Sequence, residues 1–244
     1  MNFMGTIDCF SVQHFLVMFV IILFLVIGLI YVKKNIKKRK NINRLLIVLS
    51  VFLIVIWIAC RISFVYHSIE EKDIIDFFGF KRGYNWWCIL PNSFCSFIGL
   101  IVPFIIFFNK YKNNKFLEAV YSMAILGLLT NTIYPEYIAR YPFYQFQTVG
   151  AIIYHVICGF IIIVLLMTKD LKPKLKNWYY TPIAISLMIS FGIFELVYLG
   201  FPESFNISRP LVPGVFATTV GFLCIGYVVI DVLLRLILEK LQSK

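Results

Sequence analysis

Seven long stretches of apolar residues, separated by more polar loops, dominate the pattern along the chain. A helix needs about 20 predominantly apolar residues to cross a bilayer, and each stretch is about that long. The pattern predicts an all-α, polytopic membrane protein in which residues 1–244 form a single helical-bundle domain. The predicted transmembrane helices are His14–Val32, Leu45–Tyr66, Cys88–Phe108, Phe116–Tyr134, Thr148–Thr168, Thr181–Gly200 and Val215–Leu234.

The composition agrees with this pattern and excludes other classes of protein. Hydrophobic residues make up 61% of the chain and charged residues only 14%, whereas about a quarter of the residues in a soluble domain are charged. An ordinary soluble enzyme and a disordered chain are therefore excluded. The loops leave no room for a soluble domain of normal size.

Positive charge is concentrated on one side of the predicted membrane. The net charge is +11, and most of the 23 Lys and Arg residues follow the first, third and fifth stretches or lie, as Arg235 does, in the predicted C-terminal tail. Because cytoplasmic loops are rich in Lys and Arg, we expect the N-terminus outside and the C-terminus in the cytoplasm. Topology and attraction to anionic lipids account for the basic charge, so no nucleic-acid partner is expected.

A layer of polar or reactive residues lies near the outer ends of the predicted helices. At about 1.5 Å per residue, its members lie within about 5–10 Å of the outer boundary. Polar groups inside a membrane are costly, so such a layer is a functional-site hypothesis. Glu118 and Asp231 lie near inner ends, where we expect them to reach water or cap helices. The layer consists of Arg61, Asn92, Cys95, Asn131, His155 and Glu195.

Cys95 and His155 share the same predicted depth within this layer. A thiol in apolar surroundings is inert unless a neighbouring base takes its proton, and an imidazole can do so. Asn92 precedes Cys95 by three residues, which would place both on one face of the predicted helix. Its amide could donate to a developing oxyanion. Ser96 continues that face and would leave room for a substrate.

Each of these residues also has a structural interpretation. Arg61 and Glu195 could form an ion pair that holds two helices together. Asn92 and Asn131 could form interhelical hydrogen bonds. A single membrane cysteine is usually a small apolar residue, and a single histidine is usually a partner in a hydrogen bond.

Metal and cofactor binding are not expected. The chain has six Cys and three His, but no CxxC spacing and no His/Cys cluster that would form a metal site. It also lacks a glycine-rich phosphate loop.

Two segments resemble those of a known family, the YwaF-type bacterial membrane proteins. The residues Leu90-Pro91-Asn92-Ser93-Phe94-Cys95 resemble its Leu-Pro-x-x-x-Cys signature, although Ser93 stands where the family often has His or Gln. Residues 134–146, followed by His155, are similar to its second marked region. These proteins are related to a human transmembrane cysteine acyltransferase that moves acyl chains onto ether lysophospholipids. The resemblance implies that Cys95 is the acyl-thioester nucleophile and His155 its base.

The resulting prediction is a lipid acyltransferase of the bacterial cell membrane. Its expected partners are membrane lipids, with a phospholipid or lysophospholipid as substrate. The main alternative is a non-enzymatic small-solute transporter, or the substrate-binding subunit of one, in which Arg61 would hold an anionic group. Transport requires polar groups along a path to the inner side, and the inner halves of the third, fifth and sixth stretches are almost wholly apolar. A protein whose polar residues serve only packing is a third interpretation.

Overall fold

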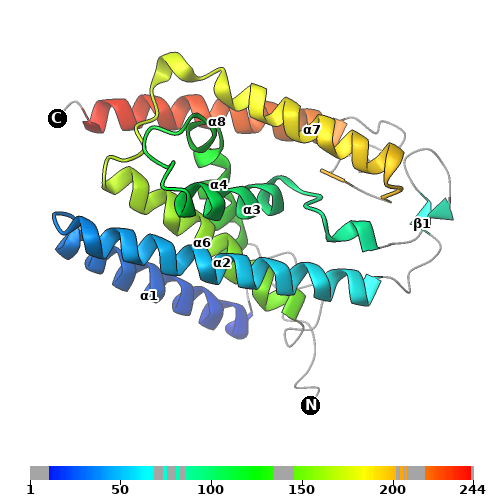
Figure 1. Ribbon diagram of the computed structural model, residues 1–244, viewed down its shortest axis with the longest axis horizontal. Coiled ribbons are helices and arrows are strands. Elements are labelled where there is room, and N and C mark those ends of the chain that lie inside the picture. Colours follow the sequence, from blue (N-terminus) through cyan, green and yellow to red (C-terminus); the bar gives the residue numbers. More distant parts are fainter. Residues whose placement is uncertain are drawn as a thin grey trace. The chain divides into compact units, whose positions relative to one another are not determined.

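The computed structural model describes residues 11–68, 74–75, 81–82, 86–133, 146–201, 204–205, 207 and 218–242. Within these residues the chain forms seven α-helices, two 3-10 helices and a pair of two-residue strands (Figure 1). The prediction of a helical protein is confirmed, apart from the antiparallel pairing of β1 with β2. The elements are α1 (Val12–Asn35), α2 (Arg39–Ser68), β1 (Ile74–Ile75), β2 (Lys81–Arg82), η1 (Trp86–Ile89), α3 (Phe94–Phe107), α4 (Lys115–Ile133), α6 (Phe146–Met167), η2 (Leu175–Asn177), α7 (Tyr180–Tyr198) and α8 (Thr218–Gln242).

Each predicted span overlaps one α-helix. Among the described residues, five stretches are long and apolar enough to cross a membrane, and α3 is a shorter apolar helix. A membrane protein is therefore supported, while seven spans and an outside N-terminus stay predictions. The five stretches are Val12–Asn35, Arg39–Ser63, Lys115–Ile133, Val149–Met167 and Leu175–Tyr198.

The start of α3 differs from the prediction. A helix beginning at Cys88 was expected, but α3 begins at Phe94 because a capping box closes its first turn. The Ser93 hydroxyl accepts from the Ser96 amide and the Ser96 hydroxyl accepts from the Ser93 amide, each at 3.2 Å. Such reciprocal bonds satisfy backbone donors that have no partner within the helix. The helix therefore has only 14 residues, and Asn92 precedes it.

Other helix ends are defined by similar local chemistry. Ser11 caps α1 by accepting from the His14 amide, and Asn114 caps α4 by accepting from the Leu117 amide. Asn109 follows α3 and Lys169 follows α6 with φ angles of 52° and 56°. This left-handed conformation is a common way to end a helix and to satisfy its last carbonyls.

Contacts divide the chain into two compact units. Unit 1 consists of residues 1–60, 99–113 and 124–171, and unit 2 consists of residues 61–98, 114–123 and 172–244. Helices α2, α3 and α4 contribute residues to both units. The single-domain organisation stays a prediction.

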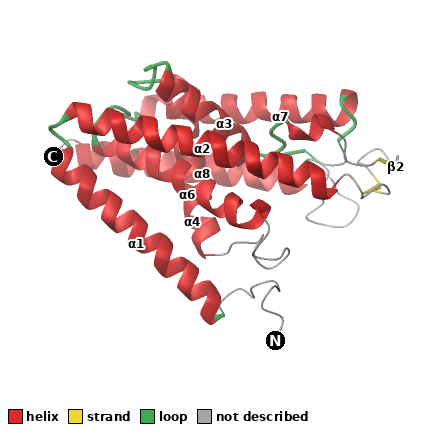
Figure 2. Ribbon diagram, turned by 60° about the horizontal axis from the view of Figure 1, so that its bottom comes forward, coloured by secondary structure: helices red, strands yellow, loops and turns green. Residues whose placement is uncertain are grey.

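Unit 1 is built around α6. Helix α1 contacts α6, and Ile21, Leu128, Ile152 and Val156 form an apolar core between α1, α4 and α6. A Cβ atom at Gly159 would lie 2.5 Å from the Leu128 Cβ, so the absent side chain permits the close approach of α4 and α6. Helices α1 and α2 are joined by a short turn and diverge away from it (Figure 2).

Unit 2 contains α7 and α8, which lie side by side (Figure 1). One apolar core joins Val65 and Cys88 to Leu196 and Phe201. Aromatic rings of α3 and α7 pack around Phe205, with the Phe94 and Phe205 rings 5.3 Å apart and nearly perpendicular. This packing holds the first turn of α3, which carries Cys95, against α7 and the segment that follows it.

Candidate functional site

Arg61 organises the irregular segment that precedes α3. Its guanidinium donates to the backbone carbonyls of Cys88, Ile89 and Leu90. It also donates to the side-chain carbonyl of Asn92 at 2.9 Å. Only 8% of the Arg61 surface is exposed. Carbonyls outside regular helix lack intrahelical donors, and Arg61 supplies these donors through its planar fork.

Asn92 is fixed on two sides within unit 2. Its side-chain oxygen accepts from Arg61, and its backbone oxygen accepts from the Phe205 amide at 2.7 Å. Because Asn92 precedes the helix, the expectation that it shares a helical face with Cys95 is wrong. The bond from Arg61 nevertheless orients the amide, so that its NH₂ group points away from Arg61 and remains a donor. The predicted oxyanion role of Asn92 stays a prediction.

Cys95 is the second residue of α3 and is half-buried. Its neighbour Phe94 packs against Phe205 and, at 5.7 Å between ring centroids, against Tyr227 of α8. The hydroxyl of Ser96, expected to leave room for a substrate, is instead used in the helix cap, where it donates to the Ser93 carbonyl. Cys95 therefore sits on a helix end that is fixed by its cap and by aromatic packing.

The imidazole of His155 is oriented by its own helix in unit 1. Its Nδ1 lies 2.6 Å from the Ala151 carbonyl oxygen, one turn earlier on α6. A carbonyl can only accept, so Nδ1 carries the hydrogen and Nε2 of the neutral ring carries the lone pair. The Tyr154 hydroxyl, 3.3 Å from Nε2, is then the donor of that bond. His155 is thus held in one tautomer, with hydrogen-bond partners at both ring nitrogens.

Gly99 of α3 packs against the same tyrosine. A Cβ atom at Gly99 would lie 3.3 Å from the Tyr154 ring, so a glycine suits this close contact in unit 1. Cys95 and His155 belong to different units, and their pairing as a dyad stays a prediction.

Two further residues of the predicted layer have local partners. Asn131 donates its amide to the Gly127 carbonyl of its own helix at 3.0 Å. Glu195 is fully buried and accepts from the Ser204 hydroxyl. The ion pair of Arg61 with Glu195 stays a prediction, whereas the contact of Arg61 with Asn92 places two members of the layer together.

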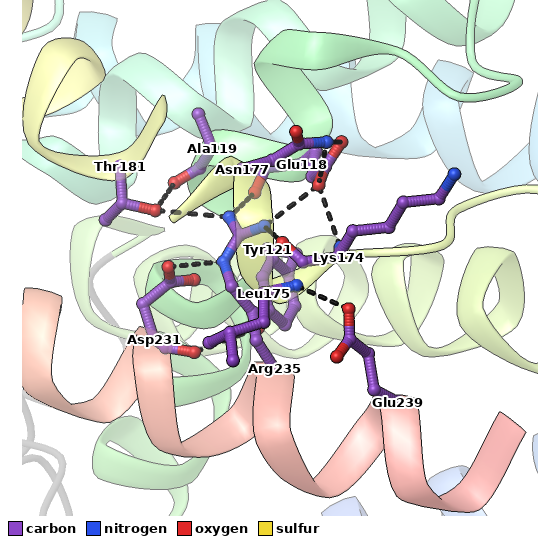
Figure 3. A network of polar contacts seen from close by, with 10 residues as sticks. All are labelled: Glu118, Ala119, Tyr121, Lys174, Leu175, Asn177, Thr181, Asp231, Arg235 and Glu239. Carbon is purple, nitrogen blue, oxygen red and sulfur yellow. Dashed lines mark hydrogen bonds and ion pairs between the residues drawn. The ribbon is translucent and has the colours of Figure 1, made fainter. Parts of the chain in front are cut away.

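A second polar site in unit 2 is centred on Arg235, which is fully buried in α8 (Figure 3). Its Nε donates to Asp231 at 2.7 Å and one Nη to Glu118 at 2.9 Å. The remaining N–H groups reach the backbone carbonyls of Glu118 and Lys174 and the hydroxyl of Thr181. All five N–H bonds of the guanidinium therefore have acceptors.

Glu118 is equally well surrounded by donors. Besides Arg235, its carboxylate accepts from the Lys174 amide and the Asn177 side chain, each at 2.9 Å. The Tyr121 ring lies beside the Arg235 guanidinium, 5.5 Å from the ring centroid. Figure 3 shows how α4, α7 and α8 converge on this one guanidinium.

Sequence reasoning missed this site. Arg235 was expected in the C-terminal tail and Glu118 and Asp231 at accessible helix ends, but α8 continues to Gln242 and all three residues are buried. The signal was present as the spacing of Asp231 and Arg235, which places an acid and a base on one face of a helix. It was overlooked because the apolar stretch was ended before Arg235.

Comparison with known proteins agrees with this membrane architecture. A model of the TMEM164 family matches residues 9–201, which is most of the chain. The chain belongs to the TMEM164 family. Neither a curated protein nor a solved structure matches the chain.

Membership of the TMEM164 family confirms the coarser part of the expected resemblance, namely the relation to the human transmembrane protein. Together with the long apolar helices, it identifies an integral membrane protein. The matched region contains Cys95 and His155 and ends before α8. A shared family establishes a shared fold, and the reaction has to be argued from the residues themselves.

Proposed function

We propose that this TMEM164 family member is a membrane-embedded acyltransferase that moves a fatty acyl chain between lipids through a thioester on Cys95. In this proposal it spans a bacterial cell membrane seven times, with its N-terminus outside, and belongs with the YwaF-type proteins. The donor is a phospholipid and the acceptor a lysophospholipid. His155 acts as the base and Asn92 as a donor to the oxyanion.

The orientation of His155 is the observation that carries this proposal. A general base needs an unprotonated nitrogen that is held in place, and the short Nδ1–H bond to the Ala151 carbonyl provides both conditions. The Tyr154 hydroxyl is the present partner of Nε2, at 3.3 Å, and in this proposal the Cys95 thiol replaces it as the donor.

The reaction would proceed in two transfers. His155 Nε2 takes the proton of the Cys95 thiol, and the thiolate attacks the ester carbonyl of the donor lipid. The tetrahedral intermediate collapses with loss of the alkoxide, which receives the proton from His155 and leaves as lysophospholipid. A hydroxyl of the acceptor, deprotonated by His155, then attacks the thioester, and the departing thiolate regains the proton.

Asn92 would stabilise the negative oxygen in both tetrahedral intermediates. Because Arg61 holds the side-chain oxygen of Asn92, the NH₂ group is the end available to a substrate. A donor fixed in advance costs no reorganisation when charge develops, and such a donor typically contributes about 10²–10³ in rate. Exclusion of water within the membrane favours transfer over hydrolysis of the thioester.

Lipid mass spectrometry of membranes with and without the protein tests the proposal. The wild-type protein should change the distribution of acyl chains among phospholipids. Cys95→Ala should abolish the change, and His155→Ala should slow it about 100-fold or more. Cys224→Ala, which removes another half-buried thiol of unit 2, serves as the matched control. If Cys95→Ala changes the distribution of acyl chains as much as the wild-type protein does, the proposal is overturned.

The transporter alternative has one observation in its favour. Transport requires buried polar groups on the inner side, and the Glu118–Arg235–Asp231 cluster supplies them on α4 and α8. If lipid composition is independent of the protein while solute accumulation depends on Arg235, transport is the better conclusion. The oriented tautomer of His155 favours catalysis.

A further inference from the structure

Three buried oxygen atoms of unit 2 have no hydrogen-bond partner among the described residues. They are Oδ1 of Asp231, Oγ of Ser122 and Oε1 of Glu195. Asp231 and Ser122 are fully buried, with 0% of their surface exposed. Buried polar atoms in native proteins almost always have a partner, and an exception is commonly explained by a bound water or ion.

The register of α4 and α8 places Asp231 and Ser122 at a similar level along the two helices. Glu118 of α4 contacts Arg235 of α8, and the Tyr121 hydroxyl donates to the Asp231 carbonyl. Rising numbers on α4 therefore pair with falling numbers on α8, so the two helices run antiparallel. Ser122 lies one turn beyond Glu118, and Asp231 lies one turn before Arg235. Both residues therefore lie one turn from the Glu118–Arg235 contact, in the same direction.

The charge of this cluster is unbalanced. Glu118 and Asp231 carry two negative charges, and Arg235 carries one positive charge. All five guanidinium N–H bonds are already used, including one to Oδ2 of Asp231. The other carboxylate oxygen of Asp231 is buried and has no donor among the described residues. A buried charge without compensation is expensive, so one further positive charge would stabilise the cluster.

We propose that Asp231 Oδ1 and Ser122 Oγ bind a monovalent alkali cation between α4 and α8. Carboxylate and hydroxyl oxygens are hard ligands that suit alkali and alkaline-earth ions. A single positive charge restores neutrality to the cluster, whereas a divalent ion would reverse the imbalance. The ion provides the partner that each of the two oxygens lacks.

Glu195 supplies the third of these oxygens, but only one. Its other carboxylate oxygen accepts from the Ser204 hydroxyl. A single oxygen makes a poor cation site, whereas Asp231 and Ser122 together supply two, so the cation is placed between α4 and α8.

Thermal unfolding of the full-length protein in detergent tests the cation site. Sodium chloride is titrated against choline chloride at constant ionic strength, with potassium chloride as a third series. A ligand that binds only the folded state raises the melting temperature, by about 5–10 °C at 100 times its dissociation constant. A saturable rise with sodium or potassium, absent with choline, is expected. No rise, or an equal rise with choline, overturns the proposal.

Three variants assign the effect to the two oxygens. Asp231→Asn should abolish the cation-dependent shift, and Ser122→Ala should raise the half-saturating concentration about tenfold, because one polar contact to the ion is lost. Ser50→Ala removes a buried hydroxyl that likewise has no partner among the described residues, but in unit 1, and should leave the shift unchanged. An unchanged shift in Ser122→Ala contradicts the site even if Asp231→Asn fails to fold.

The cation proposal is independent of the acyltransferase proposal. Cys95→Ala should keep the full cation-dependent shift, because Cys95 contributes no ligand. If Cys95→Ala loses the lipid activity but keeps the cation-dependent rise in melting temperature, the cation site is supported. If the wild-type protein has the lipid activity but shows no such rise, the cation site is excluded and the acyltransferase proposal is unaffected.

Discussion

Arg61 and Arg235 are both buried in unit 2, and they are satisfied by different kinds of partner. Arg61 donates to three backbone carbonyls and to the amide of Asn92, so it fixes a stretch of irregular backbone. Arg235 binds two carboxylates and joins α4, the segment before α7, and α8. Arg61 thus fixes the conformation of the segment before Cys95, whereas Arg235 links α4 and α8 through ion pairs. Burial of a charge therefore has a different purpose in each region.

Arg235→Ala should have the largest effect on stability. The substitution leaves two buried carboxylates without their common partner, and such a loss costs about 3–5 kcal/mol. We expect poor accumulation in the membrane and a much lower melting temperature in detergent. Arg235→Lys is the matched control, because it keeps the charge and loses the fork, and it should be intermediate. A melting temperature within 2 °C (about 1 kcal/mol or less) of wild type for Arg235→Ala would show that the cluster does not stabilise the fold.

Asn92→Asp should separate structure from catalysis in the region of Arg61. The new carboxylate still accepts from Arg61, so the fold and melting temperature should be retained. The NH₂ donor is lost, so acyl transfer should fall by about 10²–10³ if Asn92 stabilises the oxyanion. Rates are compared at equal amounts of folded protein. Full activity in Asn92→Asp would confine Asn92 to a structural role.

Arg61→Lys should loosen the segment before α3 without unfolding the protein. An ammonium group has three donors and no planar fork, so it cannot reproduce the four bonds of Arg61. Cys88 is a fully buried residue of this segment. Its alkylation by a maleimide should accelerate about tenfold, which corresponds to a free energy of opening that is lower by about 1.4 kcal/mol. Cys158 of unit 1 is the internal control and should react at its wild-type rate. Equal acceleration at both thiols would indicate global unfolding instead.

Tyr121→Phe should have the smallest effect. The hydroxyl makes one bond of 3.3 Å to the Asp231 carbonyl, and the ring beside Arg235 remains. A single neutral hydrogen bond contributes about 1 kcal/mol or less, so a fall of only a few degrees in melting temperature is expected. A fall in melting temperature as large as that of Arg235→Ala would mean that the Tyr121 hydroxyl, and not the ion pairs, stabilises the cluster.

The sequence was sufficient for the helices because a membrane imposes one simple rule, a long apolar stretch. Each predicted stretch overlaps a helix, and Arg61 and Asn92, which the sequence placed in one polar layer, are hydrogen-bonded, although this pairing was not itself predicted. The beginning of α3 was not predictable from hydropathy. It depends on a local cap between Ser93 and Ser96, which apolar content does not report.

The cluster around Arg235 was missed for a different physical reason. Hydropathy treats an arginine near the end of an apolar stretch as the start of a loop. Here α4, α7, α8 and the segment before η2 supply acceptors for every N–H of Arg235. Whether a charge is buried depends on tertiary partners that come from distant parts of the chain. The orientation of His155 is likewise a matter of one backbone carbonyl and could not be read from residue types.

Helix α8 lies beyond residues 9–201, which the family model matches, yet its Arg235 binds Glu118 of α4 within unit 2. A shortened chain ending near residue 201 would retain Glu118 and Thr181 and lose the guanidinium that both face. Such a fragment should be cleared by membrane proteases before any assay of Cys95 is possible. Swapping last helices between relatives would then succeed only when the donor carries an arginine at the matching turn.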